Sequence, residues 1–269
     1  MSALTFKLKS KLPASLDVSG LIPSRLSGKS VTEIQKMPLG EGRASIAAGD
    51  IFDVAGADTG DLRFLGDCKR LDFIGARLDS GRILVEGDAG SFSGMAMTGG
   101  MLTIAGSAGN YAGASMTEGV LKIEQNAGDF TGGALPGETA GMRGGLIVVR
   151  GKAGDRAGDR MRRGTIFVAG DAGDYAASRM VAGTLAVLGK VGAYPGYLMK
   201  RGSIVLRQQT ALPANFIDGG LQDYLWVRVL ARFLAGHGVE GVEALGSQAR
   251  RYSGDIATGG KGEILSLLG

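Results

Sequence analysis

Cysteine and histidine are almost absent from this chain of 269 residues, which contains one of each, Cys68 and His237. One cysteine rules out an internal disulfide framework, and no C-x-x-C spacing is present to hold zinc or an iron–sulfur cluster. A single histidine leaves no second imidazole for a metal site. We therefore expect no metal and no cofactor on this chain, and a reducing, cytoplasmic compartment.

Long apolar runs and blocks of one charge are also missing. The opening MSALTFKLKSKLP intersperses lysines and lacks the apolar core of a signal peptide, and no stretch approaches the roughly 18 apolar residues of a membrane span. The net charge of +4 comes from 30 basic residues interleaved among 26 acidic ones. We expect no membrane segment and see no indication of nucleic-acid binding, although the positive balance suits an acidic partner.

Glycine is abundant, at 48 residues, well above the usual share of about 7%. Seven glycines, here called the repeat glycines, recur every 19 residues with one interval of 26: Gly81, Gly100, Gly119, Gly145, Gly164, Gly183 and Gly202. Residues two and four places after each are aliphatic, as in Ile83 and Val85. Six of the ten methionines stand three places before a repeat glycine: Met97, Met116, Met142, Met161, Met180 and Met199. The spacing indicates a structural repeat.

The alternation after each glycine predicts a short strand, and glycine-rich corners such as Asp88-Ala89-Gly90 predict that every corner turns at glycine. Two aliphatic side chains and a methionine contribute about 5–8 kcal/mol per turn. This gain in free energy cannot offset the entropic cost of ordering the 19 residues of one turn, which is about 1 kcal/mol or more per residue. We therefore predict a mainly β fold, a right-handed parallel β-helix of about 19-residue turns with an inward ladder of methionines.

The ends of the chain lack the repeat and are expected to cap the stack. Residues 1–55 form a predicted N-terminal cap with a strand at Leu4-Phe6-Leu8, and residues 56–211 hold the repeats. The long interval, Gly132 to Gly141, predicts a loop. Residues 212–269 contain a helical spacing of leucines that predicts a capping helix starting at Asp218, ending at Gly236 and covering the open end.

Residues that could carry catalysis have plainer interpretations. His237 is expected at a helix end and Cys68 in a buried position. Gly28-Lys29-Ser30 ends like a phosphate-binding loop but lacks its first glycine and a leading strand. A β-helical carbohydrate enzyme would need aligned carboxylates, whereas the acids here are expected to scatter among corners without aligning over successive turns. We predict no catalytic residue and no metal ligand.

Basic residues form the most suggestive polar pattern. Arg143, Arg162 and Lys200 stand two places before a repeat glycine, and Arg163 and Arg201 stand one place before. Stacking would place these five along one edge, which we call the basic edge. A solvated face is the simpler interpretation, and contact with an acidic partner surface or a polyanionic cofactor tail is the alternative.

The unit G-x-x-M-x-x-G-x-[IL]-x-[IV]-x-G, as at Gly94 to Gly106, and the tail segments Arg251-Tyr252-Ser253-Gly254-Asp255 and Gly260 to Leu265 resemble the C subunit of formylmethanofuran dehydrogenase over nearly the whole chain. The resemblance extends to the C subunit of the bacterial formyltransferase/hydrolase complex. It implies a non-catalytic scaffold in a hetero-oligomer with a formyltransferase subunit, an amidohydrolase-like subunit and a further subunit. Such a complex passes a formyl group from tetrahydromethanopterin to a methanofuran-type carrier and releases formate.

Two alternatives remain open at this point. In the first, the chain is the C subunit of a molybdenum- or tungsten-dependent formylmethanofuran dehydrogenase. This alternative stays open because other chains decide whether the complex is hydrolytic or redox-active. In the second, the chain is a structural β-helix domain like that of glutamate synthase, which has a similar spacing of glycines.

Overall fold

Short strands that come after the repeat glycines lie side by side in one sheet. The structure, a computed structural model, describes residues 2–40 and 45–268. The sheet has 13 strands in the order β15-β16-β17-β14-β13-β12-β11-β10-β9-β8-β6-β1-β5. They are β1 (Ala3–Leu8), β5 (Phe52–Ala55), β6 (Asp58–Leu65), β8 (Arg82–Val85), β9 (Thr98–Ile104), β10 (Glu118–Ile123), β11 (Arg143–Val149), β12 (Arg163–Val168), β13 (Thr184–Val187), β14 (Arg201–Leu206), β15 (Ile217–Asp223), β16 (Gln248–Gly254) and β17 (Lys261–Leu267).

Smaller elements accompany the large sheet. Two further sheets of two strands pair β2 (Leu16–Asp17) with β7 (Leu71–Asp72), and β3 (Pro38–Leu39) with β4 (Ile46–Ala47). The α-helices are α1 (Pro23–Leu26), α2 (Val31–Gln35), α3 (Ala48–Ile51) and α4 (Leu225–Gly236). In the described part of the chain, no helix is long and apolar enough to cross a membrane.

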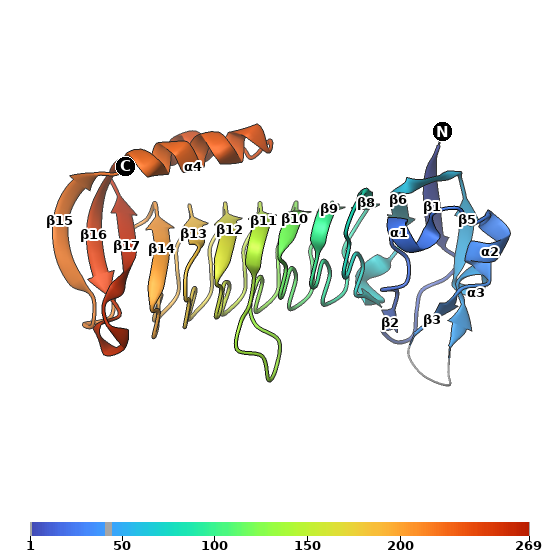
Figure 1. The fold of residues 1–269 in the computed structure, drawn as a ribbon, viewed down its shortest axis with the longest axis horizontal. Helices are drawn as coiled ribbons and strands as arrows, with labels where there is room; N and C mark the ends of the chain where they lie inside the picture. Colours follow the sequence, from blue (N-terminus) through green and yellow to red (C-terminus); the bar gives the residue numbers. More distant parts are fainter. Residues whose placement is uncertain (1, 41–44, 269) are drawn as a thin grey trace.

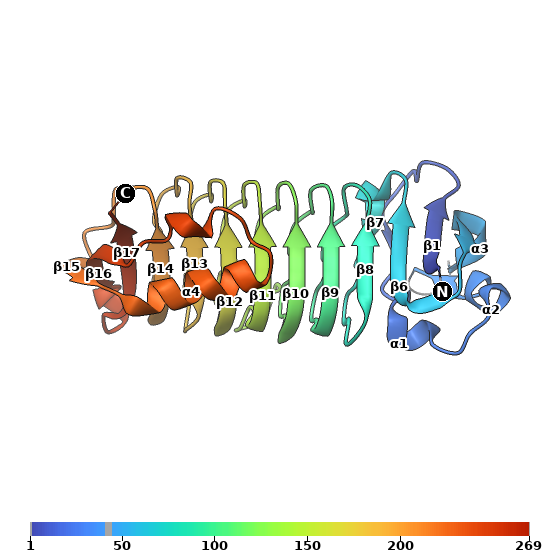
Figure 2. The ribbon, with the colours of Figure 1, turned by 90° about the horizontal axis from the view of Figure 1, so that it is seen from above.

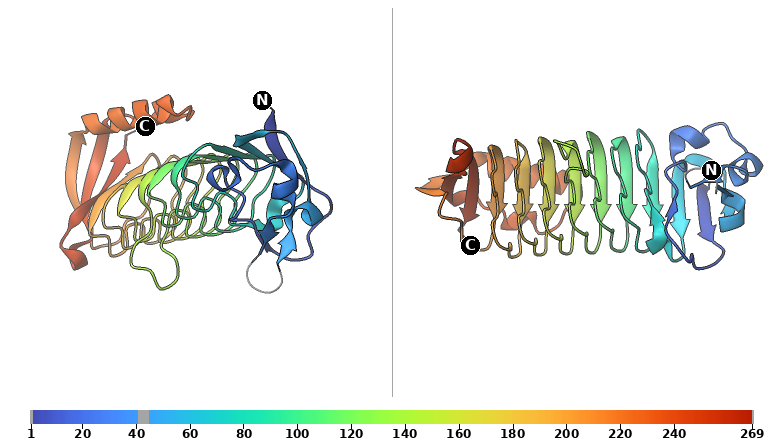
Figure 3. Two further views of the ribbon diagram at one scale, coloured as in Figure 1. Left: turned by 45° about the vertical axis from the view of Figure 1, so that its right-hand side comes forward. Right: turned by 90° about the horizontal axis from the view of Figure 1, so that it is seen from below.

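Strands β8 to β14 run parallel and in register along the repeat. The aliphatic residue two places after each repeat glycine pairs with its counterpart in the next turn, as Ile166 pairs with Leu185. Away from this sheet, single parallel bridges link Ala89, Ala108, Ala127, Ala153, Ala172 and Val191 in a second column. Figures 1 and 3 show the chain returning above itself once per strand, with the predicted loop projecting beneath β11. The predicted mainly β, parallel arrangement is confirmed.

Methionines and repeat glycines interlock across neighbouring turns. The six repeat methionines are fully buried in the core cluster that runs through the stack. A Cβ on Gly183 would lie 2.7 Å from Cε of Met161, and a Cβ on Gly164 would lie 2.8 Å from Cε of Met142. These glycines also have positive φ, 109° at Gly183 and 93° at Gly164, which glycine adopts without a steric penalty. The predicted inward methionine ladder is confirmed, and the methyl groups of four methionines occupy the space that the next repeat glycine leaves: Met116, Met142, Met161 and Met180.

Corner glycines allow close approach between turns and do not make the bend themselves. The positive φ at a corner belongs to a non-glycine residue, such as Tyr175 at 58°. A Cβ on Gly173 would lie 2.2 Å from Oδ1 and 2.8 Å from the backbone nitrogen of Asp155 in the preceding turn. The expectation that every corner turns at glycine is therefore wrong, because the corner glycine is needed for contact with the turn beneath it.

At the N-terminal end, the predicted strand at Leu4-Phe6-Leu8 is confirmed as β1, which pairs with β6 in parallel and β5 in antiparallel orientation. Phe6 stacks on Phe64 with ring centroids 5.2 Å apart and meets Phe52 edge-on at 5.7 Å. All three rings are fully buried. The three packed rings cover this end of the core.

At the C-terminal end, the prediction of a helix starting at Asp218 is wrong. Asp218 lies in β15, where its carboxylate accepts a hydrogen bond from the Gly220 amide and pairs with Arg250 of β16. The open end of the sheet is continued by β17, which pairs in parallel with β14, and then by antiparallel β16 and β15. Strand edges are satisfied best by other strands, so the edge of β14 is covered by a strand and not by the helix.

Helix α4 lies instead along the flank of the sheet, ending at Gly236 as predicted (Figures 1 and 2). Its buried residues Val227, Leu230 and Leu234 join a second apolar core. The sheet contributes outward-facing residues of β11 to β14 to this core: Leu146, Val148, Phe167, Ala186 and Val205. At the same outward position, β9 and β10 carry the polar residues Thr103 and Lys122. The apolar stretch of the outer surface therefore determines where the helix packs.

Replacing Gly144 by alanine tests the close approach between turns. Its φ is not in the positive range, but a Cβ there would lie 2.0 Å from the carbonyl oxygen of Thr117. We expect Gly144→Ala to lower the free energy of unfolding by about 1–3 kcal/mol through overpacking, measured by urea denaturation. Gly246→Ala is the matched control, since nothing lies within 4 Å of that position. Equal stability of the two variants would contradict the argument.

Candidate functional site

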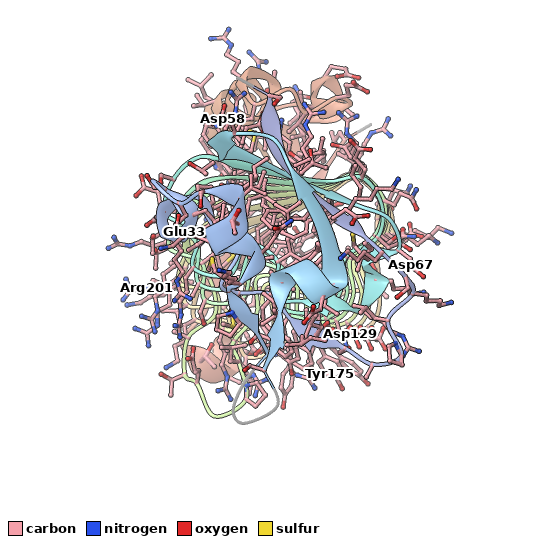
Figure 4. All side chains as sticks on the ribbon, turned by 90° about the vertical axis from the view of Figure 1, so that its right-hand side faces the viewer. Glu33, Asp58, Asp67, Asp129, Tyr175 and Arg201 are labelled. Carbon is pink, nitrogen blue, oxygen red and sulfur yellow. The ribbon has the colours of Figure 1, made fainter. Side chains whose placement is uncertain are left out.

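The basic edge lies at the entry to neighbouring strands. Arg143, Arg163 and Arg201 begin β11, β12 and β14, while Arg162 and Lys200 immediately precede β12 and β14. All five side chains are exposed. Figure 4 shows Arg201 on a side of the stack where nitrogen-tipped side chains gather, well away from Asp129 and Tyr175. The structure thus places the predicted residues on one side of the molecule.

The register along this edge differs from simple stacking in two places. Arg143 pairs with Arg163, not with Arg162, because the strand pairing shifts by one residue between Arg143 and Leu146, as it also does in β10 between Glu118 and Val120. At β13 the equivalent positions hold Val181 and Ala182, which interrupts the charge. Arg201 pairs with Lys261 of β17, so the edge extends onto the strand that closes the stack.

Two hollows lie along the basic edge. One is lined by Arg143, Arg162 and Arg163. The other has a volume of about 440 Å³ and is lined by Thr139, Arg160, Arg162, Arg179, Val181, Leu198, Lys200 and Thr258. Four cationic side chains and two hydroxyls in one hollow favour a carboxylate or phosphate group as its occupant.

A buried carboxylate positions two of these arginines. Asp159 has a side chain only 3% exposed and accepts hydrogen bonds from Nε and Nη2 of Arg179, at 3.1 and 2.8 Å. The Ser178 hydroxyl also donates to it, and Arg160 Nε lies 3.8 Å away. In contrast, within residues 2–40 and 45–268 no carboxylate pairs with Arg162 or Lys200. Those two cations are free to meet a ligand or partner.

Acidic residues at the corners do align over successive turns, which corrects the expectation that they scatter. Oδ1 of Asp129 accepts from the Asp155 amide at 2.8 Å, Asp155 accepts from the Asp174 amide at 2.8 Å, and Asp174 accepts from the Ala193 amide at 2.7 Å. Each side chain thus satisfies a backbone donor of the next turn. Among the described residues no group of three acidic, histidine or cysteine side chains is arranged to hold a metal ion. The alignment has a structural role.

Aromatic side chains form a stacked ladder along the corners, which the sequence predictions did not include. Phe73, Phe92, Tyr111 and Phe130 stack with ring centroids 4.7–5.2 Å apart, and Tyr175 stacks on Tyr194 at 5.3 Å. Arg156 fills the gap, with its guanidinium 5.8 Å from the Phe130 ring and 4.7 Å from the Tyr175 ring. The signal was present, since an aromatic residue recurs eight places before most repeat glycines. Stacked rings and cation–π contacts stabilise the corners.

The remaining candidates have structural roles. His237 comes directly after α4 as predicted, with Nδ1 2.8 Å from the Phe233 carbonyl oxygen. Ser30 caps α2 in a reciprocal pair of contacts with Glu33, which explains Gly28-Lys29-Ser30 as a helix start. Cys68 is 1% exposed, as predicted, and burial together with neighbouring Asp67 raises the pKa of its thiol to about 12.

Comparison with known proteins shows full-length similarity. The GXGXG motif family matches residues 69–220. The chain is 46% identical, over 97% of its length and 98% of the relative, to the C subunit of the formyltransferase/hydrolase complex Fhc of Methylorubrum extorquens. It is 29% identical over 34% of both chains to the C subunit of tungsten-containing formylmethanofuran dehydrogenase 2 of Methanococcus maripaludis.

A solved structure matches equally well. It is the crystal structure of the formyltransferase/hydrolase complex FhcABCD from Methylorubrum extorquens in complex with methylofuran. One of its chains superposes with a TM-score of 0.90 at 44% identity, covering 98% of this chain and 100% of that chain. The similarity therefore includes both end segments as well as the repeats.

Alkylation of Cys68 tests its burial. Since only the thiolate reacts and the pKa is raised to about 12, the thiol should stay protonated and unreactive at pH 8 in the folded protein. We expect no carboxamidomethyl adduct after treatment with iodoacetamide, and complete modification in urea, measured by intact mass. Rapid modification without denaturant would show that Cys68 is accessible.

Proposed function

Because the chain belongs to the GXGXG motif family and to the C subunits of formyltransferase/hydrolase complexes, we propose that it is the non-catalytic scaffold subunit of such a complex. The observation that carries this proposal is the 46% identity over 97% of the chain to the C subunit of Fhc. The solved FhcABCD assembly contains a chain of the same fold. The chain is accordingly a subunit of a hetero-oligomer.

The reaction we propose for the whole complex is the conversion of formyl-tetrahydromethanopterin, through a formylmethanofuran-type intermediate, to formate in formaldehyde oxidation. Its partners would be a formyltransferase subunit, an amidohydrolase-like subunit and one further subunit. Methylofuran in the related complex supports a carrier of the methanofuran type. The chemistry would lie on the partner chains, while this chain holds them in fixed positions.

A right-handed parallel β-helix over residues 56–211, between caps at 1–55 and 212–269, is the architecture we propose for this role. Six steps separate β8 from β14 in the sheet order, which at about 4.8 Å each gives a spacer of about 29 Å. Hydrogen bonds between turns on all sides support its rigidity. A stiff spacer keeps two active sites at a constant separation for a carrier that moves between them.

The basic edge is proposed to contact an acidic partner surface or a polyanionic cofactor tail. Support comes from the unpaired cations Arg162 and Lys200 in a hollow of about 440 Å³. An extended chain of carboxylates would find positive charge at β11, β12, β14 and β17 in turn. Because the residues are exposed, the attraction should depend on ionic strength.

Assembly tests the scaffold role. A tagged chain purified from its own organism should bring formyltransferase and amidohydrolase-like subunits with it, without molybdenum or tungsten, as measured by native mass spectrometry and metal analysis. Co-purified molybdenum or tungsten would assign the chain to the formylmethanofuran dehydrogenases instead. A monodisperse lone chain would refute the scaffold proposal.

Charge removal tests the basic edge. We expect Arg162→Ala with Arg163→Ala to weaken complex stability or activity several-fold at low salt, by about 1 kcal/mol or more, with the loss shrinking as salt increases. Lys7→Ala with Arg63→Ala is the matched control, since both side chains are exposed on β1 and β6, outside the basic edge and its hollows. Unchanged stability and activity of the edge variant would contradict the proposal.

A further inference from the structure

Helix α4 exposes an apolar row on the side that faces away from the sheet. Leu225, Val229 and Phe233 are spaced four residues apart, and 69%, 60% and 44% of their surfaces are exposed. Residues at this spacing lie above one another on one helix face. The opposite face, with Val227, Leu230 and Leu234, is already buried against the sheet. The exposed row is therefore not needed to hold the helix in place.

Single exposed apolar residues are common on protein surfaces, but a continuous row of three large ones is typical of an interaction site. The helix beneath it is fixed, because the apolar outer surface of β11 to β14 anchors its inner face. Figures 1 and 2 show α4 lying lengthwise across these strands, so its outer face is a fixed ridge on the flank of the stack. A fixed helix loses little conformational freedom when a partner docks.

Two arginines flank the apolar row. Arg228 and Arg232 each precede a member of the row by one residue, and both are exposed. Helix α4 contains no acidic residue. In the described part of the chain, neither arginine forms an ion pair. The outer face thus combines apolar area with unpaired positive charge.

We propose that the outer face of α4 is a docking surface for a partner subunit that presents an apolar groove flanked by carboxylates. The apolar row would fill the groove, as amphipathic helices do in protein grooves. Arg228 and Arg232 would pair with the carboxylates, since guanidinium groups bind carboxylates through two parallel hydrogen bonds. This inference depends on the proposed scaffold function, because it assigns one of the scaffold's surfaces to a partner.

A second copy of this chain is a poorer occupant on grounds of charge. Two α4 helices packed antiparallel around a twofold axis near their centres would bring Arg228 of one copy towards Arg232 of the other. Like charges at such a distance repel, and α4 supplies no carboxylate to separate them. The surface therefore complements a different, acidic chain better than itself.

The test uses the complete complex, co-expressed with a tag on this chain. In an apolar variant, Leu225→Ala, Val229→Ala and Phe233→Ala remove the row while keeping good helix formers. In a charge variant, Arg228→Glu and Arg232→Glu reverse the flanking charge. We expect both variants to lose one partner subunit, with the affinity for it lowered about tenfold or more, measured by native mass spectrometry over a dilution series.

Controls separate this inference from the proposed function and from misfolding. Ile46→Ala with Ile256→Ala removes exposed apolar residues away from α4, and Arg77→Glu with Arg82→Glu reverses distant charge; both should assemble as the unaltered chain does. Thermal unfolding of each lone chain reports folding. Full assembly of both α4 variants would overturn the inference while leaving the scaffold function intact.

Two other outcomes would also overturn the inference. If the unaltered chain recruits no subunit, the scaffold function fails and the docking surface with it. If the lone chain dimerises and the apolar variant is monomeric by light scattering, the occupant is a second copy of this chain.

Discussion

The close approach of successive turns is the constraint on which the rest of the structure depends. Backbone of one turn lies so near that of the next that a Cβ on Gly144 or Gly99 would come within 2.0–2.1 Å of a carbonyl oxygen below. Parallel strands need this proximity to form hydrogen bonds between turns. A side chain at these positions would separate the turns and remove those hydrogen bonds. Much of the glycine in the stack meets this requirement.

Other features of the repeat arise from the same constraint. Methionine can extend over a neighbouring glycine because its side chain is long and unbranched, as Met161 does over Gly183. Carboxylates such as Asp155 accept hydrogen bonds from backbone amides of the next turn. Aromatic rings stack because equivalent positions recur at the strand spacing. The polar and aromatic side chains of the corners are therefore engaged in holding turns together.

A chain built in this way is suited to positioning other proteins. Its interior is filled, and its corner carboxylates are engaged by backbone amides, so its function depends on exposed surfaces. Two surfaces stand out on a stiff body, the basic edge at the entry to β11, β12 and β14 and the apolar outer face of α4. Both are fixed in place, one by strand pairing, the other by a second apolar core. An assembly that keeps its active sites at a constant distance needs such fixed surfaces on a rigid spacer.

Periodicity in the sequence by itself determined the parallel strands, the inward methionines, the loop at Gly132 to Gly141 and the side on which the basic residues gather. Each of these depends on positions that recur within one turn, and recurrence is visible in sequence. Tertiary structure decided the features that depend on contacts between distant segments. The pairing of β17 with β14, which covers the open end in place of the predicted helix, joins residues about 60 positions apart. The shift that sets Arg143 beside Arg163 is likewise decided by strand pairing, because an irregularity in the ladder moves the partner by one residue from the position that spacing suggests.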